Sequence, residues 1–266
     1  MDVIHSVAAL RDRLQREPNN VFVPTMGNLH AGHVSLVRLA RRHARAVAVS
    51  IFVNRLQFAP GEDFERYPRT FDDDRRLLDA EGVELVFAPA ENLLYPQAQT
   101  VLVHPGPLGE ELEGRFRPGF FNGVSTVVLK LFNAVQPAAA VFGKKDYQQL
   151  AVVREMVRQL DLAVEIVAGE TAREPDGLAM SSRNAYLSAA ERAEAPRLHR
   201  LLREVTMKKI TPEQAMQQLV AAGWKPDYVE VRRRVDLKVP QAGERELVVL
   251  GAARLGRTRL IDNLEF

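Results

Sequence analysis

Two histidines three positions apart, His30 and His33, are the first residues of the chain with the means to do chemistry. They lie in the stretch PTMGNLHAGH, after an apolar run that predicts a strand and before the periodic pattern of a helix. The backbone N–H groups at the start of a helix already favour an anion. Two imidazoles there could hold the phosphates of a nucleotide, and Gly32 would let a flat base approach the backbone.

A zinc site and a purely structural role are the alternatives for these histidines. Zinc needs at least a third ligand, and usually a glutamate between the histidines as in H-E-x-x-H, and this stretch provides neither. The chain has no cysteine, which excludes thiolate metal sites, disulfides and a cysteine nucleophile. Histidines with satisfied hydrogen bonds would need no ligand. The strand-to-helix position favours the phosphate interpretation.

A lysine pair follows a later predicted strand. In FGKKDYQQL (142–150), Gly143 makes a turn and Lys144, Lys145 and Asp146 precede a helix. A lysine at the carboxyl end of a strand can reach the same phosphates as the histidines. An isolated lysine pair is also typical of a solvated loop. Position again favours a role at the nucleotide.

Hydroxyl groups and a guanidinium form a third cluster in MSSRN (180–184), where Ser181, Ser182 and Arg183 follow one another. All three side chains donate to phosphate oxygens, and a loop of this kind can close over an anion. The same residues are common in ordinary exposed loops and helix caps. The cluster therefore predicts a phosphate contact only when it is taken together with the histidine pair and the lysine pair.

Amide side chains suggest a second, smaller ligand. Asn54 and Gln57 follow an apolar strand in SIFVNRLQF, and Gln149 begins the helix after the lysine pair. Amides at strand ends suit a polar molecule that carries hydroxyl and carboxylate groups. The sequence therefore predicts a polar substrate beside the nucleotide.

The elements that must position these residues alternate between strand and helix over the first two thirds of the chain. Predicted strands cover 21–24, 46–54, 83–89, 138–143 and 164–169, with a short strand at 100–104, and predicted helices cover 33–44, 70–80, 122–135 and 147–160. This alternation predicts an α/β fold with a doubly wound parallel sheet, whose ligands sit at the carboxyl ends of the strands.

The pattern changes after about residue 170. A charged helix over 188–210 and a second helix after Thr211 precede two predicted strands, at 227–235 and 245–256. This predicts a smaller C-terminal α+β domain. We therefore expect a nucleotide- and substrate-binding domain over 1–170 and a second domain over 171–266.

Composition limits the partners and the location. Basic residues exceed acidic ones by only two, and VRRRV (231–235) has no interleaved aromatic residues, so we expect no nucleic-acid partner. The N-terminal segment lacks the apolar run of a signal peptide, and no segment approaches the roughly 18 to 20 apolar residues that span a bilayer. We expect a cytoplasmic protein without a membrane partner.

Six motifs together resemble one family. PTMGNLHAGH, SIFVNRLQF, YPRT, FRPGFFNGVSTVV, FGKKDYQQL and DGLAMSSRNAYLS occur in the order, and with about the spacing, found in the pantoate–β-alanine ligases, which belong to the H-x-G-H nucleotidyltransferases. The resemblance implies a Rossmann-like first domain, a C-terminal lid domain and a homodimer. It also implies a reaction in which ATP, with Mg²⁺, adenylates (R)-pantoate, after which β-alanine attacks the pantoyl adenylate to give pantothenate and AMP.

The resemblance implies roles for single residues. The implied catalytic residues are His33, His30, Lys145, Ser181, Ser182 and Arg183. The implied ATP-binding residues are Met26, Gly27, Asn28, Leu29, His30, Ala31, Gly32, His33, Gly143, Lys144, Lys145, Asp146, Ala172, Met180, Ser181, Ser182 and Arg183. The implied pantoate-binding residues are Gln57, Gln149, Asn54 and Met26, with Gln57 also facing β-alanine. No set of protein ligands for a metal is implied.

Three positions depart from the usual family pattern. Arg55 stands where many relatives have proline, Lys144 replaces the commoner glutamate, and Phe120 replaces the usual histidine. None of the three replaces a residue with an implied catalytic role. A different nucleotidyltransferase and a non-catalytic nucleotide-binding protein are the competing interpretations.

Overall fold

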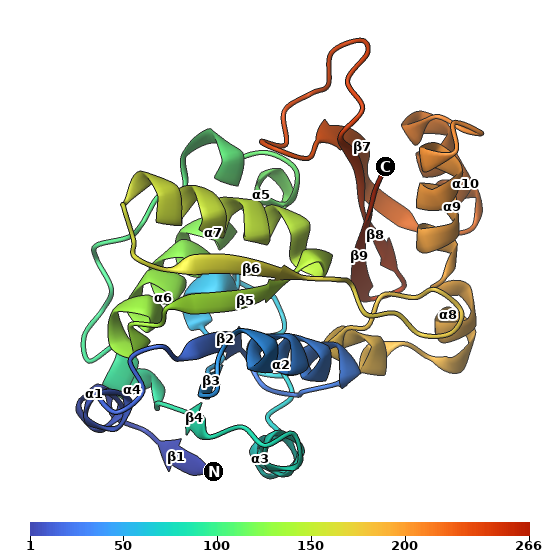
Figure 1. Cartoon of the computed structure of the whole chain (residues 1–266). Coiled ribbons are helices and arrows are strands. Elements are labelled where there is room, and N and C mark those ends of the chain that lie inside the picture. The colour runs from blue at the N-terminus through green and yellow to red at the C-terminus, as the bar shows by residue number, and fades with distance from the viewer. The chain divides into compact units, whose positions relative to one another are not determined.

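The structure is a computed structural model that describes residues 1–266 (Figure 1). The chain divides into two compact units. The first contains Met1–Lys144 and Val152–Glu170, and the second contains Lys145–Ala151 and Thr171–Phe266. The short segment 145–151 therefore groups with the C-terminal part of the chain, although its neighbours in the sequence belong to the first unit.

A six-stranded parallel sheet forms the centre of the first unit. Its strands are β1 (Asp2–Ile4), β2 (Val21–Thr25), β3 (Val47–Ile51), β4 (Leu85–Phe87), β5 (Ala139–Gly143) and β6 (Glu165–Gly169). Their order is β1-β4-β3-β2-β5-β6, and every neighbouring pair is parallel. The order reverses between β2 and β5, which is the switch point where α/β sheets bind ligands. The predicted doubly wound α/β fold is confirmed.

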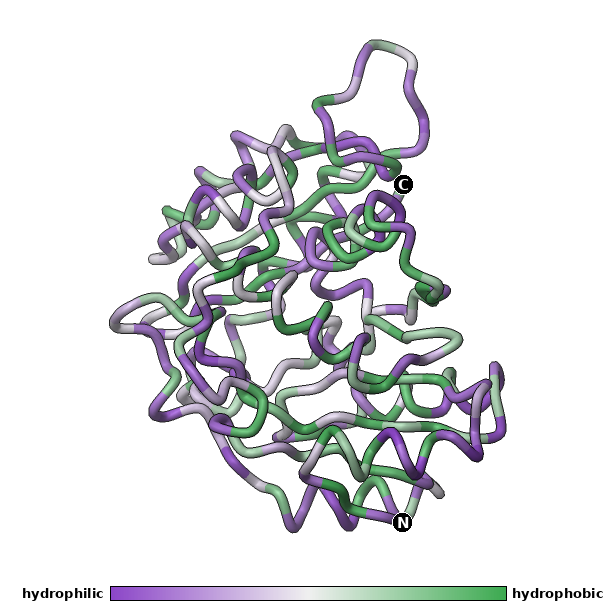
Figure 2. Tube along the Cα trace, turned by 90° about the vertical axis from the view of Figure 1, so that its left-hand side faces the viewer, coloured by the Kyte–Doolittle hydropathy of each residue, from purple (hydrophilic) through white to green (hydrophobic).

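The helices of the first unit are α1 (Val7–Leu14), α2 (Ala31–His43), α3 (Phe71–Ala80), α4 (Glu91–Leu94), α5 (Glu113–Phe116), α6 (Phe120–Val135) and most of α7 (Tyr147–Gln159), with short 3₁₀ turns η1 (Arg55–Gln57), η2 (Gly106–Gly109) and η3 (Lys144–Asp146). Apolar residues recur on one side of the longer helices, and Figure 2 shows green and purple alternating along the helical turns. Val37 of α2 and Leu78 of α3 pack in one core cluster with strand residues such as Val23.

The second unit is a small α+β structure. Its antiparallel sheet has the order β7 (Lys225–Arg233), β8 (Leu247–Leu255) and β9 (Thr258–Glu265). Its helices are α8 (Ala189–Glu194), α9 (Arg197–Thr206) and α10 (Pro212–Ala221), and η4 (Ser182–Tyr186) is a 3₁₀ turn. Leu202, Leu219 and Trp224 are buried in a core cluster with Val249 of the sheet. The predicted α+β fold of the C-terminal part of the chain is thus confirmed.

Several predicted elements differ in the structure. The strand predicted at 100–104 is wrong, since these residues pair with no other strand and Val101 is 78% exposed. The single helix predicted over 188–210 is two helices, because Pro196 stands between α8 and α9 and cannot donate a helical hydrogen bond. Strands β1 and β9 were not predicted, because β1 has only three residues and β9 carries charged residues among its apolar ones.

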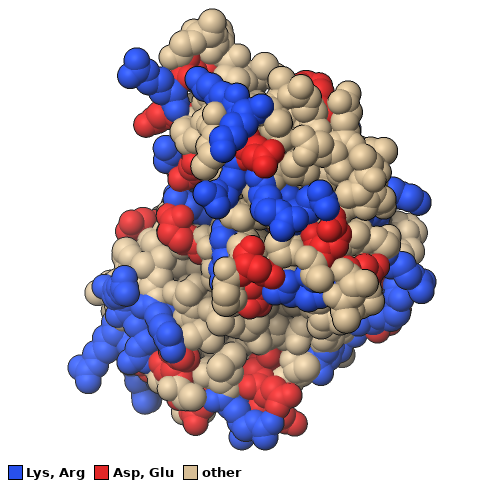
Figure 3. Space-filling view, turned by 90° about the vertical axis from the view of Figure 1, so that its right-hand side faces the viewer, with Lys and Arg blue, Asp and Glu red and all other residues tan.

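The surface carries both signs of charge, and the helices show no membrane-spanning character. Figure 3 shows a face on which basic and acidic groups are interspersed, in line with the net charge of +2. None of the helices combines the length and the apolar character needed to cross a bilayer.

Candidate active site

The turn between β2 and α2 carries both histidines in a defined hydrogen-bonded arrangement. His30 is the N-cap of α2, and its Nδ1 accepts from the Gly32 N–H at 3.1 Å. The Nδ1 of His33 accepts from the His30 N–H at 3.2 Å, and the two ring centroids are 4.1 Å apart. A neutral imidazole that accepts at Nδ1 carries its proton on Nε2. Both histidines can therefore donate through Nε2.

A buried carboxylate holds this turn from the other side. Asp74 of α3 is 2% exposed, and its two oxygens accept from the N–H groups of Asn28 and Leu29, each at 2.8 Å. The Thr70 hydroxyl donates to the same carboxylate at 3.1 Å. Gly27 lies against it at a positive φ of 80°, where an added Cβ would be 2.9 Å from an Asp74 oxygen. Asp74 therefore fixes the path of the backbone that leads to His30.

We expect Asp74→Asn to slow nucleotide chemistry while leaving the fold in place. The asparagine turns one acceptor into a donor that faces a backbone N–H, which costs about 1–3 kcal/mol for a buried group and displaces the turn. A misplacement of about 1 Å can cost roughly 100-fold in rate. We expect a loss of this order in the ATP-dependent step. The step is measured as exchange of labelled diphosphate into ATP.

The matched control is Asp72→Asn, in the same first turn of α3 but exposed. Its effect on stability should stay within about 0.5 kcal/mol. Equal exchange rates in the two variants would contradict a positioning role for Asp74.

Asn54, Gln57 and Met26 form a second connected group in the first unit. The Asn54 amide donates to the Gln57 Oε1 at 3.1 Å, and the Gln57 amide donates to the Met26 sulfur at 3.2 Å. Asn54 is 1% exposed and also donates to the Gly123 carbonyl at 3.1 Å. We therefore expect Asn54 to orient Gln57, and its direct contact with a substrate stays a prediction.

Tyr95 and Gly123 support the same group. The Tyr95 hydroxyl donates to the Asn54 Oδ1 at 2.9 Å. Burial raises the pKa of Tyr95, with a smaller contribution from the Glu91 charge, so that the hydroxyl keeps its proton. A Cβ on Gly123 would be 2.1 Å from the Leu56 carbonyl oxygen. Only glycine allows α6 to approach the η1 turn closely enough to place Gln57.

The residues of the lysine pair belong to different units. Gly143 and Lys144 are the last two residues of the segment Met1–Lys144, which belongs to the first unit. The Lys144 ammonium is 2.6 Å from the Glu170 carboxylate. Lys145 and Asp146 begin the segment that groups with the second unit, with their charged groups 3.8 Å apart. The Asn263 amide of β9 donates to the Lys145 carbonyl at 2.9 Å. Lys145 is thus positioned by the C-terminal sheet.

The serine and arginine cluster lies in a hydrogen-bonded loop of the second unit. The Ser181 hydroxyl caps η4 by accepting from the Arg183 N–H at 3.3 Å. The Met180 N–H donates to the Ala172 carbonyl at 2.9 Å, which closes the loop between them. The structure therefore brings Ala172, Met180 and the Ser181–Arg183 turn into one loop of the second unit.

A buried ion pair anchors that loop to β9. Arg173 donates to both oxygens of Asp262, at 2.8 and 2.9 Å, and His199 Nδ1 lies 3.2 Å from the same carboxylate. Burial alone would raise the pKa of Asp262. The hydrogen bonds from His199 and Arg173, together with their charges, instead hold it below the ordinary value of 3.8. Asp262 is therefore a carboxylate at neutral pH.

We expect Asp262→Asn to lower the free energy of unfolding by about 3–5 kcal/mol at neutral pH, because it leaves the Arg173 charge without its buried partner. The folded protein binds its proton at Asp262 less readily than the unfolded chain does. The contribution of Asp262 is therefore complete above pH 3.8 and is lost as the pH falls below that value. Urea unfolding at a series of pH values measures both effects, and a difference from the wild type that does not shrink in acid would contradict the assignment.

Three departures from the family pattern have local partners. Arg55 is paired with Glu65 and Glu91 and lies 3.9 Å from the centroid of the Phe64 ring. Lys144 is paired with Glu170, as described above. The Phe120 ring packs against Phe121 and lies under the Arg117 guanidinium, at 3.8 Å.

Asp74 and Asp262 were missed in the sequence, although each carries a signal. Asp74 stands four residues before the buried Leu78, on the same face of α3, and Asp262 stands two residues after the buried Leu260, on the same face of β9. A carboxylate at an apolar position of an amphipathic element needs a partner. No group of three or more His, Cys, Asp or Glu residues is arranged to hold a metal ion.

Imidazole and amide side chains at the carboxyl ends of a parallel α/β sheet stand where enzymes of the nucleotide-binding α/β class hold their ligands. Residues 2–265 match the family model described as pantoate-beta-alanine ligase. The chain belongs to this family and is a carbon–nitrogen bond-forming ligase that joins pantoate and β-alanine.

Named relatives agree with this family. The chain is 57% identical over 273 residues to the pantothenate synthetase of Nitrosospira multiformis and 59% identical over 274 residues to that of Thiobacillus denitrificans, covering 100% of this chain and 98% and 97% of the relatives. The pantothenate synthetase structure from Thermus thermophilus is 47% identical with a TM-score of 0.93, covering 100% of this chain and 99% of that one. The ligase from Francisella tularensis, complexed with beta-gamma ATP and β-alanine, is 31% identical with a TM-score of 0.88, covering 100% and 97%.

Proposed function

We propose that the chain condenses (R)-pantoate with β-alanine in two steps, of which the first consumes ATP. In the first, a carboxylate oxygen of pantoate attacks the α-phosphorus of ATP, and diphosphate leaves. In the second, the β-alanine amine attacks the acyl carbon of the pantoyl adenylate. The new C–N bond forms as the C–O bond to AMP breaks, and the amine loses a proton.

The observation that carries this proposal is that the Nδ1 atoms of His30 and His33 both accept from backbone N–H groups at the start of α2. Each neutral ring then presents an Nε2 donor. Attack by one anion on another is slow without donors that neutralise the charge on phosphorus. We propose that His33 stabilises the α-phosphate during attack and that His30 is its partner, with Met26–Leu29, Ala31 and Gly32 lining the ATP site.

The second unit supplies most of the other nucleotide contacts in this proposal, and Gly143 and Lys144 of the first unit supply the rest. Lys145 contacts the α-phosphate, and Ser181, Ser182 and Arg183 bind the leaving phosphates. Gly143, Lys144, Asp146, Ala172 and Met180 complete the nucleotide site. We further propose that the C-terminal domain acts as a lid over the bound nucleotide. Such a lid would exclude water, which hydrolyses acyl adenylates.

Pantoate binds, in this proposal, to the amides of Gln57 and Gln149 with Met26 beside them. The bond between Gln57 and the Met26 sulfur supports this assignment, because it turns one amide toward the wall of the histidine turn. The Mg²⁺ ion that accompanies ATP would be held by the phosphates, since no protein cluster of ligands is present, and would offset their charge.

We further propose a cytoplasmic homodimer, and light scattering that gives a monomer mass would contradict the dimer.

The test is exchange of labelled diphosphate into ATP with purified protein. Exchange that requires (R)-pantoate and not β-alanine is the expected result, because only the first step makes diphosphate. Exchange that ignores pantoate would overturn the proposal in favour of a different nucleotidyltransferase. Absence of both exchange and turnover would favour a non-catalytic nucleotide-binding protein.

A further inference from the structure

The proposed roles leave one charged group of the substrates without a partner. β-Alanine has an amine at one end and a carboxylate at the other. The basic residues that have a role in the proposed reaction contact ATP, and the pantoate contacts are amides. A carboxylate that has left water needs a charged or hydrogen-bonding partner. A cation near Met26 and Gln57 would complete the site.

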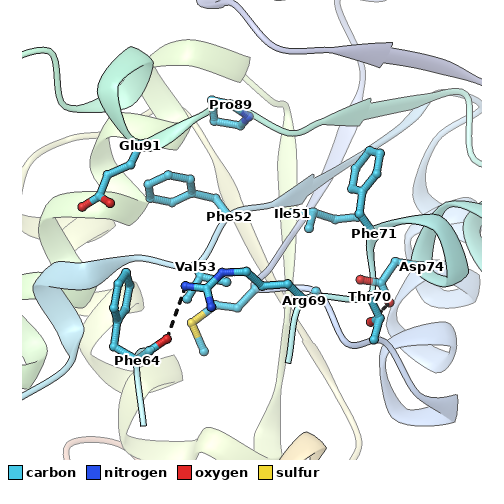
Figure 4. Close-up of a pocket in the computed structure, with 12 residues that line it drawn as sticks. Ile51, Phe52, Val53, Phe64, Arg69, Thr70, Phe71, Asp74, Pro89 and Glu91 are labelled. Atoms are coloured by element: carbon cyan, nitrogen blue, oxygen red, sulfur yellow. Dashed lines mark hydrogen bonds between the residues drawn. The ribbon is translucent and has the colours of Figure 1, made fainter. Parts of the chain in front are cut away.

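A pocket in the first unit contains such a cation. It has a volume of about 270 Å³ and lies where β3 and β4 end (Figure 4). Its walls are mostly apolar, with Phe52, Phe71 and Pro89 among them, and Met26 also lines it. The size is near the lower end for small-molecule sites and suits a short amino acid. Met26 connects the pocket to the amide of Gln57.

Three charged side chains line the pocket, and two of them are already engaged. Asp74 accepts from two backbone N–H groups and from Thr70, and Glu91 is paired with Arg55 at 3.1 Å. Arg69 is the third, and no carboxylate pairs with it: its guanidinium donates only to two backbone carbonyls. The positive charge of Arg69 is therefore available to an incoming anion.

The two carbonyl bonds also fix where the Arg69 guanidinium lies. It donates to the Tyr67 carbonyl at 3.2 Å and to the Phe64 carbonyl at 3.3 Å. Figure 4 shows the side chain extending across the pocket toward Phe64. A guanidinium has five N–H donors, so others are left for a carboxylate after these two bonds. An arginine held in this way loses little freedom when it binds an anion.

We propose that Arg69 binds the carboxylate of β-alanine in this pocket, with the amine directed toward Met26 and Gln57. This assignment rests on the proposed function, because the amine must meet the pantoyl adenylate there. The apolar walls accept the two methylene groups. The ligand class is a short amino acid with its amine and carboxylate at opposite ends, and the pocket selects for the carboxylate.

The test compares β-alanine with its amide, which has the same amine and no carboxylate. Arg69→Ala should lower kcat/KM for β-alanine about 10- to 100-fold, the range expected for a lost charge-assisted hydrogen bond. It should leave kcat/KM for the amide and the pantoate-dependent diphosphate exchange unchanged. The matched control is Arg66→Ala, in the same loop but outside the pocket, which should keep the preference for β-alanine.

A loosened loop gives a different result from a lost carboxylate contact. If Arg69→Ala lowers kcat/KM equally for β-alanine and its amide, or changes neither, the proposal is overturned. If this variant does not fold, Arg69→Gln must show the same selective loss, because its amide can still donate to a loop carbonyl. Failure of the proposed function itself would appear in the wild type as exchange without pantoate, which is independent of Arg69.

Discussion

His33→Ala is expected to lower the rate of pantoate-dependent diphosphate exchange about 100- to 1,000-fold, the usual cost of removing one donor that stabilises charge in a transition state. The structure gives the reason, because the Nδ1 of His33 accepts from the His30 N–H and thereby places the donor proton on Nε2. Binding of ATP should change much less than the rate, since charge at phosphorus is greatest during attack.

The alanine variant also removes a helix cap, and a second variant separates the two losses. His33→Gln places an amide oxygen where it can accept from the His30 N–H, as in an ordinary capping box. We expect it to restore the melting temperature and not the exchange rate. Recovery of exchange to within about threefold of the wild type, which is about 0.7 kcal/mol in the activation barrier, would show that His33 acts only as a cap.

Much of this architecture could be predicted from local sequence. Apolar runs such as VFVP identify buried parallel strands because both faces of the sheet are covered. The position of His30 and His33 followed from the strand before them and the helix pattern after them. Pro196, in contrast, stands inside a predicted helix, and its missing N–H ended that helix where periodicity alone continued it.

The support of the site was harder to predict, because its contacts join residues far apart in the chain. Asp74 holds backbone groups that lie about 45 positions earlier, and the Asn54 bond to the Gly123 carbonyl spans 69 positions. Periodicity can indicate that a carboxylate is buried, but it does not identify the donor. The close approach at Gly123 depends on backbone atoms of η1, which no side-chain pattern reports.

Lys145→Ala is the second substitution expected to have a large effect, again a loss of about 100-fold or more in exchange rate if its ammonium contacts the α-phosphate. Lys145 follows β5, and its carbonyl is held by the Asn263 amide at 2.9 Å. The Lys145 ammonium forms an ion pair only with Asp146, at 3.8 Å. Asn263→Ala should therefore slow exchange less than Lys145→Ala, because it loosens the backbone and leaves the ammonium in place.

The neighbouring lysine provides the matched control. Lys144 has the same charge and adjoins Lys145, but it belongs to the first unit and is paired with Glu170 at 2.6 Å. Although Lys144 lines the proposed nucleotide site, we expect Lys144→Ala to slow exchange much less than Lys145→Ala, because the Lys144 ammonium is paired with Glu170 and an ion pair of this kind contributes roughly 0–1 kcal/mol. Equal losses in the two variants would mean that the loop supplies only a general positive potential. Loss confined to Lys145, and not recovered by Lys145→Arg, would identify a point contact that a planar guanidinium cannot replace.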